Sequence, residues 1–162
     1  MGGTVALKLE QQHEGLFDAV ALVNPFIRSH SPPPCVCLLK CLAKCFPRWA
    51  AIDLFGEPID LYKHYFDDKL VYGGKLRLGT GLSLSVQAET VAQAFHLLAV
   101  DFHVSFSLED TVVSEAAIRE LIEKAPATKK EMVEYQADHM LYSYGNLVER
   151  VVDAQCAFFE KY

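Results

Sequence analysis

The sequence predicts an α+β domain in which helices cover one face of a small, largely antiparallel sheet. Residues 4–10 and 100–108 alternate apolar and polar side chains, and residues 69–86 contain a Gly-Gly turn followed by a run with leucines at even positions. The polar positions of the 100–108 segment predict that one face of the sheet meets water, which is typical of antiparallel sheets. A long C-terminal helix over residues 128–162 completes the predicted fold.

The composition is that of one globular domain. The chain has 162 residues, of which 51% are hydrophobic and 22% are charged, so it is long enough to bury a core and apolar enough to stay folded. We therefore treat residues 1–162 as a single α+β domain. The formal net charge is −6 and the basic residues are scattered, which argues against a nucleic-acid partner.

Other features of the sequence concern the cellular compartment. No stretch approaches the roughly 20 apolar residues that a membrane-spanning helix needs, and the N-terminus lacks the cationic start of a secretory signal. Most of the five cysteines fall within residues 35–45, unlike the spaced framework of a secreted disulfide-rich domain. These features predict an intracellular protein in a reducing compartment.

The first elements in chain order are a strand over residues 4–10 and a helix over residues 14–23. The strand follows from the alternation of its side chains, and the helix from apolar residues that recur on one face. The helix should end at Asn24-Pro25, because a residue before proline is pushed out of the helical region.

Residues 35–46 are predicted to form a helix that is apolar except for two lysines. Its cysteines recur at four-residue steps, so the outer two lie about 12 Å apart along the axis, whereas zinc holds sulfur at about 2.3 Å. We therefore expect reduced, metal-free cysteines that pack as small hydrophobes. The alternative is peripheral membrane contact through residues 35–49 with acylated cysteines. The candidate lipidation sites are Cys37, Cys41 and Cys45.

Three further helices are predicted between these segments and the C-terminal helix. A proline suited to the first helical position opens a short helix after residue 58, and residues 88–98 place apolar side chains on a common face. Ser114 is the predicted N-cap of a helix that runs to Ala125.

The helix over residues 128–162 carries the longest helical pattern, with apolar or small side chains at alternating spacings of four and three. Such a helix would be roughly 50 Å long in a domain roughly 40 Å across. It must therefore project beyond the domain or break, and Gly145 is the predicted break. The expected contacts with another chain are Tyr144, Leu147, Val151, Phe158, Phe159 and Tyr162.

No constellation of catalytic residues stands out. Asp101 and His103 lie two apart on a predicted strand, so they share a face and could orient each other or bind a metal. The simpler interpretation is the solvent-facing side of a half-buried sheet. His139 follows an acidic stripe that lacks the paired Glu-x-x-His motifs of di-iron bundles. We predict no cofactor and no metal.

These observations favour a non-enzymatic accessory subunit or adaptor that docks its long C-terminal helix into a larger assembly. Its partners would be other protein chains, in a hetero- or homo-oligomer. The alternative is a small enzyme or ligand-binding domain with a pocket over the sheet near Asp101 and His103. The molecular mass of the isolated chain in solution tests the first hypothesis.

Overall fold

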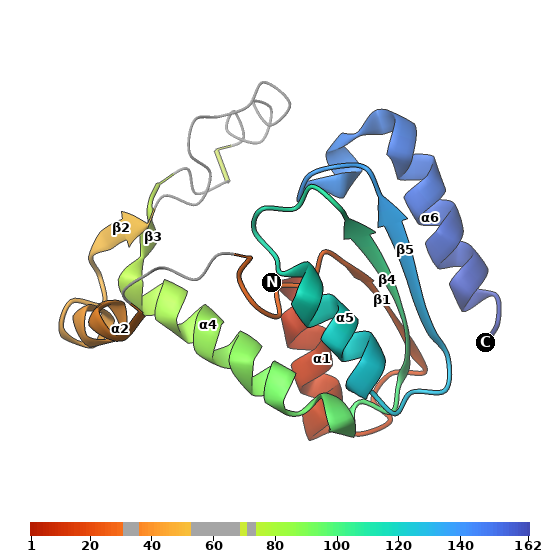
Figure 1. Cartoon of the computed structure of the whole chain (residues 1–162), viewed down its shortest axis with the longest axis horizontal. Coiled ribbons are helices and arrows are strands. Elements are labelled where there is room, and N and C mark those ends of the chain that lie inside the picture. Colours follow the sequence, from red (N-terminus) through yellow and green to blue (C-terminus); the bar gives the residue numbers. More distant parts are fainter. Residues whose placement is uncertain (31–35, 53–68, 71–73) are drawn as a thin grey trace. The chain divides into compact units, whose positions relative to one another are not determined.

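The computed structural model describes four ranges of the chain, which are residues 1–30, 36–52, 69–70 and 74–162. The chain divides into two compact units (Figure 1). Unit 1 combines Met1–Ser31 with Gln87–Tyr162, and unit 2 is Pro32–Val86. Whether the whole chain acts as a single domain stays a prediction.

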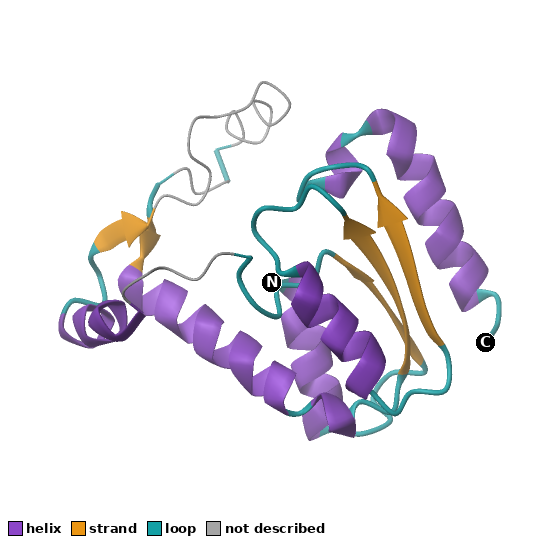
Figure 2. Ribbon diagram, in the orientation of Figure 1, coloured by secondary structure: helices purple, strands orange, loops and turns teal. Residues whose placement is uncertain are grey.

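Unit 1 is built on a three-stranded parallel sheet with the order β1-β4-β5 (Figure 2). The strands are β1 (Ala19–Val23), β4 (Asp101–Ser107) and β5 (Lys130–Tyr135). Both pairings of the central strand β4 run parallel, so the predicted α+β fold with a largely antiparallel sheet is wrong. The described antiparallel ladder is confined to a short pair of strands in unit 2.

Helices cover both faces of this sheet. Figure 1 shows α1 (Gly2–Gln12) and α5 (Glu115–Lys124) on one face and α6 (Gly145–Phe159) on the other. Unit 1 also contains two 3-10 turns, η2 (Phe95–Leu97) and η3 (Leu141–Ser143), and the last part of α4 (Leu78–Gln93). A parallel sheet is normally buried on both sides because its crossover connections place helices there.

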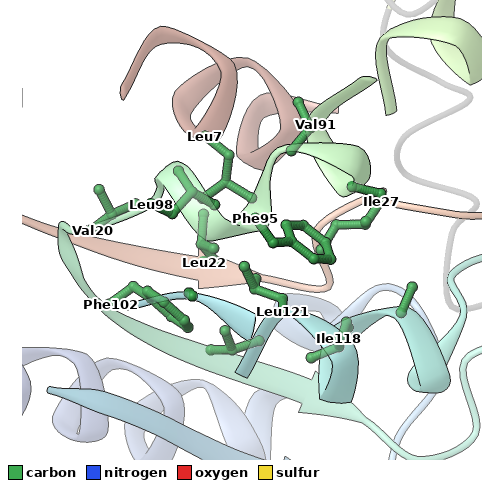
Figure 3. Packing of buried hydrophobic residues seen from close by; sticks show 14 of the residues in the cluster. Leu7, Val20, Leu22, Ile27, Val91, Phe95, Leu98, Phe102, Ile118 and Leu121 are labelled. Atoms are coloured by element: carbon green, nitrogen blue, oxygen red, sulfur yellow. The ribbon is translucent and has the colours of Figure 1, made fainter. Parts of the chain in front are cut away.

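The main core lies between the sheet and helices α1 and α5. Phe102, Val104 and Phe106 of β4 are at most 1% exposed and point into it. Figure 3 shows Phe102 and Leu22 from the sheet beside side chains from the covering helices. The helical side chains labelled there are Leu7, Val91, Ile118 and Leu121.

The second face of β4 is buried as well, which contradicts the predicted solvent-facing side. His103, Ser105 and Ser107 are all 0% exposed. Phe158 of α6 packs against the His103 ring, with the ring centroids 5.7 Å apart. The alternation of residues 100–108 correctly predicts a strand, but the polar side chains meet a helix instead of water.

The first two predicted elements are wrong in type. Residues 4–10 belong to helix α1, in which Thr4, Leu7 and Glu10 are buried at three-residue spacing while Val5 is 52% exposed. Part of the predicted helix at residues 14–23 is strand β1. A short strand in a parallel sheet lacks clear alternation of polarity, so its apolar residues also fit a helical period.

The long helix over residues 128–162 is not present as one element. The segment forms strand β5, turn η3 and then α6, which begins at Gly145. Residues 130–135 pair with β4 along their whole length, and this tertiary pairing outweighs the local helical pattern. Because residues 128–162 form no single helix, a helical overhang no longer supports contact with another chain.

Two predictions of local structure are confirmed. The hydroxyl of Ser114 accepts a hydrogen bond from the amide of Ala117 at 3.4 Å and caps α5. Helix α2 (Val36–Cys45) lies within the predicted 35–46 segment. The predicted helix end at Asn24-Pro25 is not among them, because the element before Asn24 is strand β1. Asn24 has a left-handed φ of 39°, a conformation that asparagine tolerates better than most residues.

Unit 2 contains α2, a short antiparallel pair and the first part of α4 (Leu78–Gln93). The pair joins β2 (Ala50–Ile52) to β3 (Leu76–Arg77). The predicted strand over residues 69–86 is therefore wrong for most of its length, because α4 replaces it. The predicted short helix after residue 58 and the Gly-Gly turn fall wholly or partly outside the described residues. Within those residues, no helix is long and apolar enough to cross a membrane.

Candidate active site

Asp110 lies just beyond the C-terminal end of β4, in a turn that buries its carboxylate. The side chain is 0% exposed. One carboxylate oxygen, Oδ1, accepts hydrogen bonds from the backbone amides of Val112 and Val113 at 2.7 and 2.8 Å. These two bonds fix the plane of the carboxylate and leave Oδ2 for another partner.

His139 supplies that partner from the next strand along the sheet. It follows the C-terminal end of β5, and its Nδ1 lies 2.7 Å from Oδ2 of Asp110. An ionised carboxylate only accepts hydrogen bonds, so Nδ1 carries the proton and donates it. Because β4 and β5 are parallel neighbours, their C-terminal ends lie at the same edge of the sheet, where ligands bind in open α/β sheets.

The surroundings of Asp110 keep its carboxylate charged. Burial raises the pKa of this carboxyl, but hydrogen bonds from His139 and from the amides of Val113 and Val112 outweigh burial, and the pKa lies below its ordinary value. The imidazole of His139 is 33% exposed. The pair thus joins a buried fixed anion to a partly exposed imidazole in a defined tautomer.

This arrangement has a definite chemical capacity. With Nδ1 protonated, Nε2 of a neutral His139 carries a lone pair that can accept a proton. The carboxylate of Asp110 holds the imidazole in orientation and stabilises the positive charge that proton transfer creates. The pair can therefore act as a general base and then as a general acid toward a nucleophile and a leaving group.

A family model described as serine aminopeptidase, S33, matches residues 1–142. The chain belongs to this S33 family of hydrolases. The matched range includes both Asp110 and His139. Membership overturns the predicted non-enzymatic adaptor and the associated expectation that the chain is an accessory subunit, since the family is one of hydrolases. No match was found among curated proteins.

Solved structures share the fold of this S33-family chain. A monoacylglycerol lipase of Paleococcus ferrophilus has a TM-score of 0.80 at 18% identity, over 96% of this chain and 63% of that one. A soluble variant of the Saccharomyces cerevisiae monoglyceride lipase has 0.77 at 16%, over 98% and 59%. The enol-lactonase of Burkholderia xenovorans has 0.65 at 19%, over 99% and 63%. The S33-family chain thus spans about three-fifths of these proteins, and the likeness establishes the fold.

Asp101 and His103, the candidate residues on β4, do not form a common site. Asp101 accepts hydrogen bonds from the Lys129 amide and the Tyr162 hydroxyl, each at 2.7 Å. His103 is covered by Phe158, and its Nε2 lies 3.1 Å from the Ser105 hydroxyl. A fully buried imidazole cannot contact a substrate, so the site does not lie there.

The six expected contact residues of the C-terminal segment divide by burial. Leu147, Val151 and Phe158 are at most 7% exposed and pack inside this chain. Phe159 and Tyr162 are 46% and 52% exposed, and Tyr144 packs partly against the cluster around Val151. Contact with another chain stays a prediction, and only exposed members of the set could make it.

The candidate lipidation sites lie on α2 in unit 2. Cys41 and Cys45 are free and exposed, and Cys37 is part of the same helix. The expectation that these cysteines pack as small hydrophobes is wrong for Cys41 and Cys45. Their modification stays a prediction.

Sequence reasoning missed Asp110 and His139 as a pair. They are 29 residues apart in the sequence and meet only because β5 pairs with β4. A signal was present, since each residue follows a strand of the same sheet. It could be recognised only after residues 130–135 were identified as a strand parallel to β4.

Proposed function

We propose that the protein hydrolyses carboxylic esters through a serine nucleophile that Asp110 and His139 activate. The single observation that carries the proposal is the Nδ1–Oδ2 hydrogen bond of 2.7 Å at the C-terminal edge of a parallel sheet. In α/β-hydrolases the triad follows the chain order serine, acid, histidine. Asp110 precedes His139, in agreement with that order. The names of the structural neighbours, lipases and a lactonase, favour an ester over an amide.

The reaction follows from the proton positions. Nε2 of His139 accepts the proton of the serine hydroxyl as the oxygen attacks the ester carbonyl carbon. The same nitrogen then gives that proton to the departing alcohol, and an acyl-enzyme remains. Water repeats the sequence and releases the acid. Asp110 keeps its negative charge throughout and stabilises the imidazolium.

Packing at the start of α1 supports a location for the nucleophile near this helix end. A Cβ added to Gly3 would lie 2.9 Å from the Cβ of Pro25, so the first turn of α1 is in close contact with the chain just after β1. Asn24, the neighbour of Pro25, binds the backbone carbonyl of His139 at 2.8 Å. These contacts place the N-terminal end of α1 near the pair.

The nucleophile of this architecture lies on a sharp turn from a strand into a helix, where glycines allow the turn. Gly2 and Gly3 at the start of α1 fit the helical side of such a turn. Met1 to Thr4, the residues at this end of α1, include no serine, so the experiment below has to locate the nucleophile.

The test is covalent labelling of the full-length protein with a fluorophosphonate, followed by mapping of the labelled residue. We expect a single labelled serine, and turnover of glycerol esters. Asp110→Asn and His139→Gln should lower kcat by roughly 10⁴-fold. Matched controls are Asp153→Asn and His96→Gln, which change exposed residues elsewhere in unit 1.

Two outcomes would contradict this proposal. Labelling that His139→Gln leaves unchanged would show that the pair activates no serine. Turnover of aminoacyl anilides without turnover of esters would instead assign the site to peptide hydrolysis, in line with the family description.

We also propose peripheral membrane contact through residues 35–49. Its support is a run of exposed apolar side chains beside basic ones: Leu38, Phe46 and Trp49 are between 55% and 59% exposed. Lys40 and Arg48 are exposed in the same segment. Such a composition suits an anionic membrane surface.

Flotation with vesicles of anionic lipid should capture the protein and lose it for a Phe46→Ser, Trp49→Ser variant. Leu16→Ser, at a residue 50% exposed in unit 1, is the control. Equal capture of all three proteins would argue against a role for the segment.

A further inference from the structure

Asn24 has a polar side chain that is almost completely enclosed at the edge of the sheet that carries the candidate active site. It is 4% exposed and directly follows β1 with a left-handed backbone. Its backbone amide still donates to the carbonyl of Ser105 at 3.1 Å, so the residue stays attached to β4. Its amide side chain lies against the segments that follow β4 and β5.

Three hydrogen bonds use that side chain. Nδ2 donates to the hydroxyl of Ser107 and to the backbone carbonyl of His139, each at 2.8 Å. Oδ1 accepts the backbone amide of Ser107 at 2.9 Å. Both hydrogens of Nδ2 are used, and Oδ1 faces a donor. A flipped amide would set Oδ1 against the His139 carbonyl, so the contacts define one orientation.

The bonds connect the C-terminal ends of all three strands of the parallel sheet. Asn24 directly follows β1, Ser107 ends β4 three residues before Asp110, and His139 follows β5. The bond to the His139 carbonyl holds the backbone of that residue, while Asp110 holds its ring. His139 is thereby held at its backbone and at Nδ1 of its ring.

We infer that Asn24 is a positioning residue for the Asp110–His139 pair. It acts through the backbone of His139 and touches no reacting atom. The inference rests on the proposed function, because the pair needs positioning only if it transfers protons. A displacement of about 1 Å in a catalytic group can cost about 10²-fold in rate, and the bond from Asn24 opposes such a displacement.

Three variants separate positioning from general packing. Asn24→Gly keeps the left-handed backbone, which glycine adopts readily, and removes the amide with its bond to His139. Ser107→Ala removes a hydroxyl that the same amide binds but leaves the bond to the His139 carbonyl in place. Asn24→Asp keeps the shape and the oxygen that accepts the Ser107 amide, but it has no hydrogen to donate to His139.

The experiment measures ester hydrolysis and the proton NMR signal of His139 Nδ1 in the full-length protein. That proton is observable only while the bond to Asp110 protects it from exchange with water. Asn24→Gly and Asn24→Asp should lower kcat by roughly 10- to 100-fold, change KM by less than about threefold, and broaden or remove the Nδ1 proton signal. Ser107→Ala should keep the signal and lose less than about threefold in kcat.

The inference is overturned if the Asn24 variants match Ser107→Ala in both kcat and the Nδ1 signal. It is also overturned if both Asn24 variants fail to fold by circular dichroism, since Asn24 would then serve folding rather than positioning. If the wild-type protein shows the Nδ1 signal but hydrolyses no ester, the proposed function fails. The NMR comparison still decides whether Asn24 positions His139.

Discussion

Replacement of Phe158 by alanine should destabilise unit 1 far more than the same change at its neighbour Phe159. Phe158 is 0% exposed, and its ring centroid lies 5.7 Å from that of His103 and 5.5 Å from that of Tyr162. Removing a fully buried phenylalanine ring typically costs about 3–5 kcal/mol, because it leaves a cavity as well as losing apolar burial. Phe159 is 46% exposed, so its loss should cost about 1 kcal/mol.

Urea unfolding and thermal melting followed by circular dichroism would measure the difference. For a chain of this size each kcal/mol lowers Tm by about 2–4 °C, so Phe158→Ala should lower Tm by roughly 6–20 °C and Phe159→Ala by a few degrees. Equal small effects would refute the packing of α6 on β4. A Phe159→Ser, Tyr162→Ser variant tests the expected contact of the C-terminal segment with another chain. A lower mass in size exclusion than that of the wild type would show that these exposed rings make such a contact.

Three further predictions concern local features of unit 1. The pKa of Asp110 is lowered in the folded chain, so this carboxylate stabilises the fold above its unfolded pKa near 3.8. The stabilisation is lost as pH falls through the folded pKa. Unfolding measured over an acid titration should show this loss in the wild type and not in Asp110→Asn. Gly3→Ala should cost about 1–3 kcal/mol in urea unfolding, because its Cβ would lie 2.9 Å from Pro25, whereas Gly2→Ala meets no atom within 4 Å and should be neutral or stabilising. Ser114→Ala should cost about 1 kcal/mol in the same measurement, since it removes the N-cap of α5.

Local signals in the sequence predicted part of this fold. Strand β4 and the capped helix α5 were recognisable because alternation and a serine cap each depend on neighbouring residues alone. Local patterns predicted the wrong element where pairing with a distant strand decides the structure. Residues 130–135 fit a helical period, but pairing with β4 makes them a strand. Both faces of β4 are buried because helices pack on each side of the sheet.

The same errors prevented prediction of the candidate site. Asp110 and His139 come together only because β4 and β5 are parallel neighbours. The predicted helix over residues 128–162 excluded that arrangement. Asn24 was visible only as the residue before a proline. Its contact with His139 needs the three-strand order, which no local period specifies.

The order of the strands also affects how the chain tolerates change. Asn24 and Ser107 bind each other although they are 83 residues apart in the sequence, and unit 2 lies within that interval. Closing a flexible loop costs entropy that rises only with the logarithm of its length, so doubling the interval would cost only about 0.6 kcal/mol. Insertions and deletions in unit 2 should therefore change the free energy of the β1–β4 pairing very little. Evolution can change the length and side chains of unit 2 while the edge of the sheet that holds Asp110 and His139 stays intact.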